Sequence, residues 1–456
     1  MLIIVIGAGE VGFNVAARLA REFKDIVVID KDEQKLERVS ELLDVRTLHG
    51  SGSSMSVLRK AEIERADILI AATDSDEVNM ISCLVAGAQS RVPKKVARIR
   101  DPEYAANARI MGPDRLGIDL VINTDQEAVE SILRILETHR AKEVVDLADG
   151  RLRMASFVAD QSNPLTGKRL QELAAVFPNS HHLIVAAIVR GDSIVIPRGH
   201  DKIELNDLVY LLGSREAISE AFLSFDPENA KPPRRVMING GNSLGLRLAQ
   251  ALEAKGVQVW VVDPSEERCE MLASELDRAT VIKGDITSAE LLRDEGGQRL
   301  DVFLSLTGDD ERNILVSLLA RRIGCRRVIA LADRISYVSL AYQTGVDVVV
   351  SPSLIAINKI LQYVRRGRVA NVVSLPEGLA EVVEVEALET SDLVAAPLKE
   401  LRLPKGILVG AVSRGEEVMV PTGETRIRPG DRVAMIVAAD SLKLLEKVVS
   451  VKLDYW

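Results

Sequence analysis

Aromatic side chains are scarce in this sequence: Phe, Trp and Tyr account for 3% of its 456 residues. Basic residues are not clustered either, and 58 Lys and Arg against 67 Asp and Glu leave a net charge of −9. Nucleic-acid binding needs a concentrated positive surface, and binding of single strands also needs aromatic stacking platforms. A nucleic-acid partner is therefore not expected.

Cysteine and long apolar runs are also lacking. The three cysteines stand far apart and form no CxxC motif, so we expect buried thiols in a reducing compartment and no disulfide or metal site. No apolar run approaches the ~18 residues that a membrane-spanning helix needs. Met1 leads directly into a strand pattern, without the features of a signal peptide. These absences predict a soluble, cytosolic protein.

The most informative stretch is the first one, an apolar run (Leu2–Ile6) that ends in a GxGxxG turn and is followed by a helical pattern. Gly7 permits the tight turn, Gly9 leaves room for a pyrophosphate, and Gly12 lets the helix pack closely on the sheet. Asp30 ends the next apolar run, about 20 residues on, as the dinucleotide fingerprint requires. The stretch therefore predicts a Rossmann-type nucleotide site.

The chemistry of this stretch also selects a ligand class. Unpaired N–H groups at the start of the helix favour phosphate. A carboxylate at Asp30 accepts both hydroxyls of an adenosine ribose and repels a 2′-phosphate, so NAD(H), or a nucleotide such as ATP, is preferred to NADP. The alternative is that the glycines serve only the packing of helix on strand. No catalytic residue is predicted.

The first part of the chain continues as alternating strand and helix patterns. Near-continuous Val, Ile and Leu runs between helical patterns indicate a parallel, doubly wound sheet. The expected strands after Asp30 are 45–50, 67–73, 95–100 and 117–122, and the expected helices are 32–43, 54–60 and 76–89.

The pattern then repeats. Gly245 corresponds to Gly12 and Asp263 to Asp30, and both pairs are separated by the same number of residues. Thr307 corresponds to Thr73 after a single insertion. The sequence therefore contains two copies of one dinucleotide-type module.

A smaller module follows each copy. Its short alternating runs, broken by Arg-Gly turns, predict hairpins of a small β-rich domain. The two small modules share a Pro, a Gly and an Asp at a constant separation: Pro197 and Pro421, Gly199 and Gly423, and Asp207 and Asp431. The predicted fold class is α/β, with two tandem units that each contain a Rossmann-like parallel sheet and a small α+β domain. The expected domains are 1–123, 124–226, 234–351 and 352–456, with a stiff polar linker at 226–233 and a separate core in each unit.

An amphipathic helix precedes each small module. Each carries one apolar stripe, which packs either on its own sheet or on a neighbouring module, and periodicity alone does not select the partner. The stripes are Ala128, Val129, Ile132, Leu133, Ile135 and Leu136, and Leu354, Ile355, Ile357, Ile360, Leu361 and Val364.

Several short motifs carry a resemblance: VIGAGEVG with Asp30, then 48–51, 72–74, Asn79 and 97–100, and the Pro/Asp pairs of the small modules. Together with the duplicated order of domains, they resemble the tandem RCK (regulator of K⁺ conductance) subunits of bacterial Trk-type potassium uptake. The resemblance covers essentially the whole chain.

The resemblance implies a regulatory subunit on the cytoplasmic face of the inner membrane, assembled as a homo-oligomeric, tetrameric ring beneath a potassium-translocating membrane partner of the Trk type. Binding of NAD⁺/NADH, with ATP or ADP as alternative ligands at the same site, would gate the partner allosterically. It also implies the residues of the first site: Gly7, Ala8, Gly9, Glu10, Val11, Asp30, Thr73, Asp74, Arg98 and Arg100.

The two arginines are informative without the resemblance. Arg98 and Arg100 are two apart on the fifth predicted strand, so both side chains are expected on one face at its carboxyl end. Two guanidinium groups beside an apolar sheet need an anion, which a phosphate chain supplies. The alternative is an ordinary ion pair with surface carboxylates.

The second copy departs from this pattern. Asn242 stands where the first copy has Gly9, so a Cβ faces the expected pyrophosphate. Leu331 and Asp333 replace the two arginines, whereas Asp263 is retained. We expect the second site to be empty, weaker or altered in its ligand preference. Its candidate residues are Gly240, Gly241, Asn242, Ser243, Leu244 and Asp263.

Two other classes of protein use the same module. An NAD-dependent oxidoreductase needs an acid or base beside the nicotinamide, yet none of the five histidines recurs in the second copy; Lys283 stands for His49 and Glu424 for His200. A redox-sensing transcription factor needs a basic helix-turn-helix, which the sequence does not contain. Both alternatives rank below the gating subunit.

Overall fold

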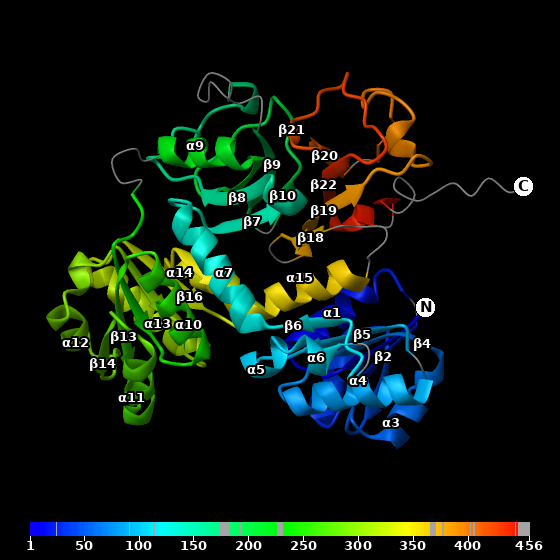
Figure 1. Ribbon diagram of the computed structural model, residues 1–456. Helices are drawn as coiled ribbons and strands as arrows, with labels where there is room; N and C mark the ends of the chain where they lie inside the picture. The colour runs from blue at the N-terminus through cyan, green and yellow to red at the C-terminus, as the bar shows by residue number, and fades with distance from the viewer. Residues whose placement is uncertain are drawn as a thin grey trace, which may run out of the picture. The chain divides into compact units, whose positions relative to one another are not determined.

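The structure is a computed structural model (Figure 1). It describes residues 1–23, 25–90, 92–112, 115–172, 183–191, 193–225, 231–364, 371–375, 378–401, 403–404, 406–442 and 444–445. These residues form two compact units, Met1–Glu130 with Arg234–Val364, and Ser131–Pro233 with Arg365–Trp456. Most of the predicted linker (226–230), as well as His181 and His182, lies outside the described residues.

The first unit contains a six-stranded parallel sheet near the N-terminus, in the order β3-β2-β1-β4-β5-β6. Alternate residues of β1 point to opposite faces, so Ile3 and Val5 join one apolar core while Ile4 and Ile6 join the other. Both faces are therefore covered by helices, as a parallel sheet requires. The elements are β1 (Leu2–Ile6), α1 (Glu10–Leu19), β2 (Asp25–Asp30), α2 (Glu33–Leu42), β3 (Arg46–His49), α3 (Met55–Lys60), β4 (Ala66–Ala71), α4 (Asp76–Ser90), β5 (Lys94–Arg98), α5 (Pro102–Ala105), α6 (Ala108–Met111), β6 (Leu120–Ile122) and α7 (Thr124–Glu137).

A second six-stranded parallel sheet in the same unit has the equivalent order, β14-β13-β12-β15-β16-β17. The predicted duplication and fold class are therefore confirmed. The elements are β12 (Arg235–Asn239), α10 (Ser243–Ala254), β13 (Gln258–Asp263), α11 (Glu266–Glu275), β14 (Thr280–Lys283), α12 (Ala289–Asp294), β15 (Val302–Ser305), α13 (Asp310–Ile323), β16 (Arg327–Leu331), α14 (Ile335–Thr344), β17 (Val348–Val350) and α15 (Pro352–Val364).

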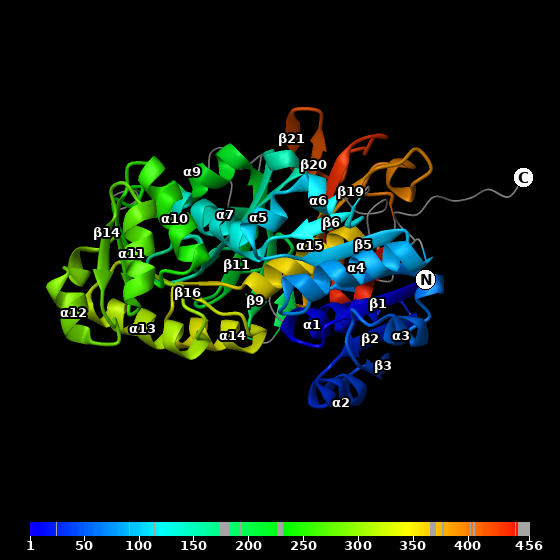
Figure 2. The ribbon, with the colours of Figure 1, turned by 60° about the horizontal axis from the view of Figure 1, so that its bottom comes forward.

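The apolar stripe of α15 packs on the first sheet, not on the sheet that precedes it in sequence. Ile357 and Ile360 are fully buried in one core with Ile3, Val5 and Val15. Figures 1 and 2 show α15, in yellow, beside α1 and the blue strands. The expectation that each unit has a core of its own is therefore wrong, because part of the core of the first sheet comes from a helix in the second half of the chain. The corresponding stripe of α7 is also buried, apart from half-buried Leu133.

The other compact unit holds two five-stranded sheets whose pairings are all antiparallel, in the orders β10-β9-β11-β8-β7 and β18-β19-β22-β20-β21. One apolar core joins them, with Met154 and Leu212 from the first sheet and Val382 and Ile436 from the second. The elements are β7 (Glu143–Leu147), β8 (Leu152–Val158), β9 (Leu183–Arg190), β10 (Ser193–Val195), β11 (Leu208–Ser214), α9 (Arg215–Phe225), β18 (Asn371–Ser374), β19 (Ala380–Glu386), β20 (Ile407–Arg414), β21 (Glu417–Met419) and β22 (Arg432–Ala438).

The repeated Asp of the small modules has a structural role. Asp207 accepts two hydrogen bonds from the guanidinium of Arg190, at 2.8 and 2.7 Å, and Asp431 accepts the equivalent pair from Arg414, at 2.9 and 2.7 Å. Both carboxylates are almost fully buried. Each ion pair therefore fixes the loop before the last strand of its sheet.

Candidate nucleotide-binding site

The three glycines of the first loop are required for different reasons. Gly7 has a φ of +102°, and a Cβ there would lie 2.9 Å from the carbonyl oxygen of Ala72. A Cβ on Gly12 would lie 1.8 Å from the carbonyl oxygen of Gly7. A Cβ on Gly9, in contrast, would meet nothing within 4 Å. Packing within the chain explains Gly7 and Gly12, whereas the open space at Gly9 leaves room for a ligand.

Helix α1 starts directly at this opening. Its N-cap residue, Gly9, provides no side-chain hydrogen bond to the first turn. Unpaired N–H groups and the helix dipole make such a terminus favourable for an anion. Glu10 and Val11, the other predicted phosphate contacts, are the first two residues of the helix.

Asp30 ties the second strand to the glycine loop. Its carboxylate oxygens accept hydrogen bonds from the backbone N–H of Ala8, at 2.6 Å, and of Asp32, at 2.9 Å. Each carboxylate oxygen has a further lone pair for a ribose hydroxyl. Asp30 therefore supports the loop in addition to its predicted contact with the ribose.

Thr73 is held at the end of β4 by a buried amide that recurs in both copies. Asn79 accepts hydrogen bonds from the N–H and the hydroxyl of Thr73, at 3.0 and 2.7 Å. It donates to the carbonyl oxygens of Thr73 and Arg98, at 3.1 and 2.8 Å. Asn313 makes the equivalent bonds with Thr307 and with the carbonyl oxygen of Leu331. One side chain thus connects the ends of β4 and β5.

The two arginines meet at Asp74, although only one of them belongs to the strand. β5 ends at Arg98, so the prediction that both lie on this strand is wrong for Arg100. The backbone N–H of Arg100 instead donates to both carboxylate oxygens of Asp76, at 3.1 and 2.9 Å. A guanidinium nitrogen of Arg98 lies 3.5 Å from Asp74, and one of Arg100 lies 3.1 Å from the same oxygen.

These contacts leave Arg98 incompletely satisfied. Its side chain is 7% exposed whereas that of Asp74 is 81% exposed, and its Nε has no hydrogen-bond partner among the described residues. Burial lowers the pKa of Arg98, and the charge of Arg100 lowers it further; Asp333, Asp74 and Asp125 act in the opposite direction. A buried guanidinium with an unpaired N–H is suited to an incoming anion.

The predicted residues of the first site are thus connected. The glycine loop contacts Asp30 and the backbone at Ala72, Asn79 links Thr73 to Arg98, and Asp74 links the two arginines. Sequence reasoning assigned no role to Asp76. The repeat offered a signal for it, because Asp310 stands at the equivalent position of the second copy and accepts the equivalent hydrogen bonds from Asp333 and Arg334.

The second copy differs at the same places. The side chain of Asn242 accepts a hydrogen bond from the N–H of Gly245, at 2.9 Å, and donates to the carbonyl oxygen of Leu306, at 2.7 Å. It therefore caps the helix whose counterpart is uncapped in the first copy. Asp263 accepts from the N–H of Gly241 at 2.7 Å.

Other features around the second site also reduce the space and charge available to a ligand. Arg268 donates to Asp263 at 2.9 Å, and the side chain of Asp263 is 5% exposed. A Cβ on Gly241 would lie 2.6 Å from Leu272. Leu244 is buried, and Leu331 provides no charge at the end of β16.

Neither the cysteines nor the histidines form a reactive centre in the described part of the chain. Cys83 and Cys325 are buried, as predicted, whereas Cys269 is half-buried. Burial raises the pKa of Cys83 to about 12 and that of Cys325 to about 11. His49 contacts the carbonyl oxygen of Lys31 at 3.0 Å. Among the described residues, no group of acidic, His or Cys side chains is arranged to hold a metal ion, and no helix is both long and apolar enough to cross a membrane.

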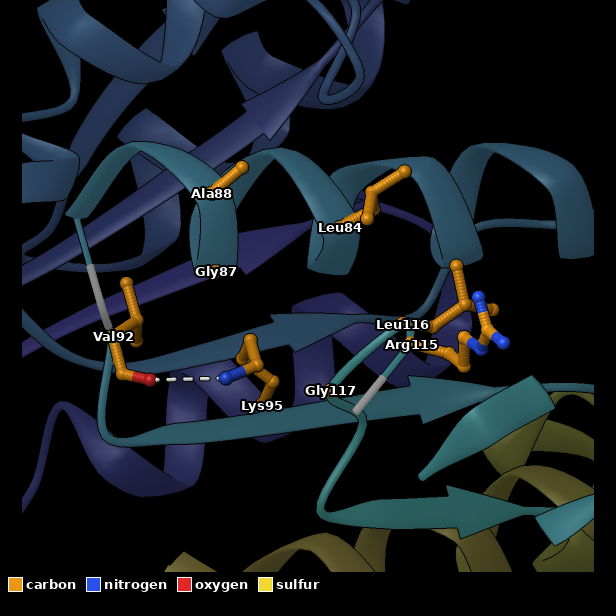
Figure 3. Close-up of a pocket in the computed structure, with 8 residues that line it drawn as sticks. All are labelled: Leu84, Gly87, Ala88, Val92, Lys95, Arg115, Leu116 and Gly117. Carbon is orange, nitrogen blue, oxygen red and sulfur yellow. Dashed lines mark hydrogen bonds between the residues drawn. The ribbon is translucent and has the colours of Figure 1, made fainter. Parts of the chain in front are cut away.

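A separate cavity of ≈ 420 Å³ lies between α4 and the amino end of β5 (Figure 3). Lys95 and Arg115 line it, and Lys95 donates to the carbonyl oxygen of Val92 at 3.2 Å. None of the predicted nucleotide contacts lines this cavity. Ligands of parallel α/β sheets bind at the carboxyl ends of the strands, so this cavity is separate from the candidate site.

The chain matches two domain families along its length. The TrkA-N domain matches residues 3–144 and 236–352, and the TrkA-C domain matches residues 154–226 and 382–450. Among solved structures, the GsuK RCK domain has a TM-score of 0.60 at 21% identity, covering 98% of this chain and 94% of that one. The GsuK channel has a TM-score of 0.62 at 20% identity, covering 98% and 78%. The fold is therefore the tandem RCK fold.

Full-length relatives are more similar in sequence. The chain is 37% identical to the Trk system potassium uptake protein TrkA of Azorhizobium caulinodans, over 100% of both chains. It is 39% identical to the TrkA protein of Halomonas elongata, over 96% of both chains, and 32% identical to TrkA homolog 1 of Methanosarcina mazei, over 98% and 99%. These relatives are named as potassium uptake proteins. The chain belongs to the TrkA family of Trk system potassium uptake proteins.

Proposed function

We propose that this protein is the nucleotide-sensing regulatory subunit of a Trk-type potassium uptake system. The observation that carries the proposal is the opening at Gly9, which combines an uncapped helix start with the buried, incompletely paired Arg98. Both features favour the phosphates of a nucleotide. The full-length similarity to proteins named for potassium uptake supplies the physiological setting.

The proposed ligand is NAD⁺ or NADH, with ATP or ADP as alternatives at the same site. Gly7, Ala8, Gly9, Glu10 and Val11 would contact the phosphates through their backbone. Asp30 would accept the ribose hydroxyls, Thr73 and Asp74 would border the nucleotide, and Arg98 and Arg100 would approach the phosphate chain. A GsuK channel of similar fold was solved bound to NAD, so the fold is compatible with this ligand.

The second Rossmann domain is proposed to bind phosphate weakly or not at all. The cap formed by Asn242 uses the N–H of Gly245 that a phosphate would otherwise approach, and Arg268 already pairs with the ribose acid, Asp263. Each chain would then hold one nucleotide in its first domain.

The remaining parts of the proposal concern assembly. The protein would form a homo-oligomeric ring, tetrameric by resemblance, on the cytoplasmic face of the inner membrane beneath a Trk-type potassium-translocating subunit. The domains would be 1–123, 124–226, 234–351 and 352–456. Nucleotide binding would change the conformation of the ring and so control the membrane partner.

An exchange of the two loop residues tests the site. The full chain is titrated with NADH and with ADP by isothermal calorimetry, and one binding site per chain is expected. Gly9→Asn transplants the second copy's cap into the open space at Gly9. It should weaken binding at least about tenfold, because it removes charge-assisted hydrogen bonds to phosphate.

The control for this exchange is Asn242→Gly, which should leave binding at the first site unchanged. Thermal unfolding of both variants checks that the fold is retained. Undiminished binding in Gly9→Asn would show that the loop does not hold the phosphates.

A further inference from the structure

A contact between the two Rossmann domains starts in the glycine loop itself. The carboxylate of Glu10 accepts a hydrogen bond from the backbone N–H of Ile335, at 3.0 Å. Ile335 begins α14 of the second domain, and the N-cap residue of that helix, Arg334, provides no side-chain cap. A carboxylate at a helix N-terminus is stabilising, because it pairs with an orphan N–H and with the helix dipole. Glu10 of the first domain thus caps a helix of the second.

An acidic side chain of the second domain stands two residues before that helix. Asp333 stands where the first copy has Arg100, and its carboxylate accepts a hydrogen bond from Ser353 at 2.7 Å. Among the carboxylates around Arg98, Asp333 is the strongest in opposing the lowered pKa of that residue. An arginine at position 333 would place a third cation near Arg98 and Arg100. The change from arginine to aspartate in the second copy therefore makes the two domains complementary in charge.

The cap that Glu10 forms has no counterpart in the reverse direction, from the second domain to the first. The residue equivalent to Ile335 in the first domain is Pro102, which has no backbone N–H. The residue equivalent to Glu10 in the second domain is Ser243, which hydrogen-bonds Asp125. The reciprocal cap cannot form. The second loop instead contacts the start of α7 through Ser243, and Arg247 of α10 donates to Gln126 at 3.1 Å.

We propose that the second Rossmann domain is a built-in competitor of the nucleotide, which holds the first site through Glu10 and Asp333 and releases it when phosphate binds. The inference rests on the proposed function of the first site and assigns a role to the second domain. Phosphate and the carboxylate of Glu10 are both anionic and meet at the start of α1, and the charge of Asp333 acts on the same arginine that phosphate would approach. A bound nucleotide therefore weakens the cap on α14, and loss of either carboxylate favours the nucleotide.

The affinity test uses Asp333→Asn in the full chain, titrated with NADH and with ADP. The asparagine retains an oxygen that can accept the hydrogen bond from Ser353 and removes only the charge. Binding should tighten at least about fivefold, the lower end of typical coupling between sites. Asp285→Asn is the matched control: it removes an exposed charge that pairs with Arg312 in the same domain and should leave the affinity unchanged. Equal affinity of Asp333→Asn and wild type would overturn the proposal.

Hydrogen exchange provides a readout that separates this inference from the proposed function. Glu10→Ala should accelerate exchange in the first turn of α14 about fivefold without any nucleotide, the effect of losing a helix cap. In wild type, NADH should slow exchange in the glycine loop and accelerate it in that turn. Absence of protection in the loop would contradict nucleotide binding at this site. Protection in the loop with no change in α14 would contradict the competition.

Discussion

The side-chain amide of Asn79 donates a hydrogen bond to the carbonyl oxygen of Arg98 over 2.8 Å, although 19 residues separate them in sequence. The same amide holds the N–H, the hydroxyl and the carbonyl oxygen of Thr73. Asn79 is fully buried, so these are its available partners. The position of the arginine at the proposed phosphate site therefore depends on a residue that touches no ligand.

Asn79→Ala should weaken nucleotide binding and destabilise the first Rossmann domain by about 1–3 kcal/mol, the effect of leaving buried polar groups unpaired. Asn313→Ala removes the equivalent amide of the second domain and is the control. It should produce a similar loss of stability with little change in affinity. Calorimetric titration and thermal unfolding measure the two effects, and an equal loss of affinity in both variants would contradict the positioning role.

The packing of α15 predicts that the first sheet depends on a distant part of the chain. Ile360→Ala should lower the local stability of β1 by about 2–5 kcal/mol, because it leaves a cavity in a fully packed core. Hydrogen exchange of Leu2–Ile6 measures the change. Leu340→Ala, at a position that is 49% exposed, is the control and should leave exchange in β1 unaltered.

For the same reason, a fragment that ends at residue 226 should expose the core of the first sheet and lose stability, although the sequence suggested an independent half.

The buried ion pair of the last small domain predicts a loss of stability in acid. Burial acts to raise the pKa of Asp431, but hydrogen bonds from Arg414 and from the backbone of Arg428 outweigh it and hold the pKa below its usual range. A lowered carboxyl pKa stabilises the fold above the unfolded value, and this stabilisation is lost as the pH falls through the folded one.

Asp431→Asn should therefore destabilise β22 by about 3 kcal/mol at pH 7, since it leaves Arg414 without its buried partner. The difference from wild type should shrink below about pH 4, where the unfolded carboxyl becomes protonated. Hydrogen exchange of Arg432–Ala438 at both pH values measures it. Glu416→Gln, at an exposed turn, controls for the change of charge, and a difference that does not vary with pH would contradict the prediction.

The sequence predicted the parallel sheets well, because buried Val and Ile runs and the glycine spacing are local signals. It did not predict the partner of α15, because a stripe of apolar residues indicates that a helix is buried but does not identify the element on which it packs. The sequence showed that Asn242 adds a Cβ at the position of Gly9. It did not predict that the Asn242 side chain caps α10. The role of Glu10 could not be predicted either, because it depends on a hydrogen bond between residues in different halves of the chain.

The proposed gating role predicts how one arginine affects ion flux. A nucleotide controls a partner only if it binds two conformations of the ring unequally, since equal binding shifts no equilibrium. Typical coupling is about 1–3 kcal/mol, or roughly 5–150-fold. Arg100 is a suitable source of that difference, because its side chain is 41% exposed beside Asp74, where phosphate would approach it.

Arg100→Ala should reduce nucleotide-dependent potassium flux through the reconstituted complex with its membrane partner while the fold is retained. Arg115→Ala removes a cation at the amino end of the same sheet, beside the separate cavity, and should leave the flux response unchanged. NADH absorbance followed during the flux measurement should stay constant, since gating needs binding and no turnover. Stoichiometric oxidation of NADH with a small-molecule substrate would overturn the gating role and favour an oxidoreductase, because hydride transfer consumes the bound cofactor whereas gating leaves it unchanged.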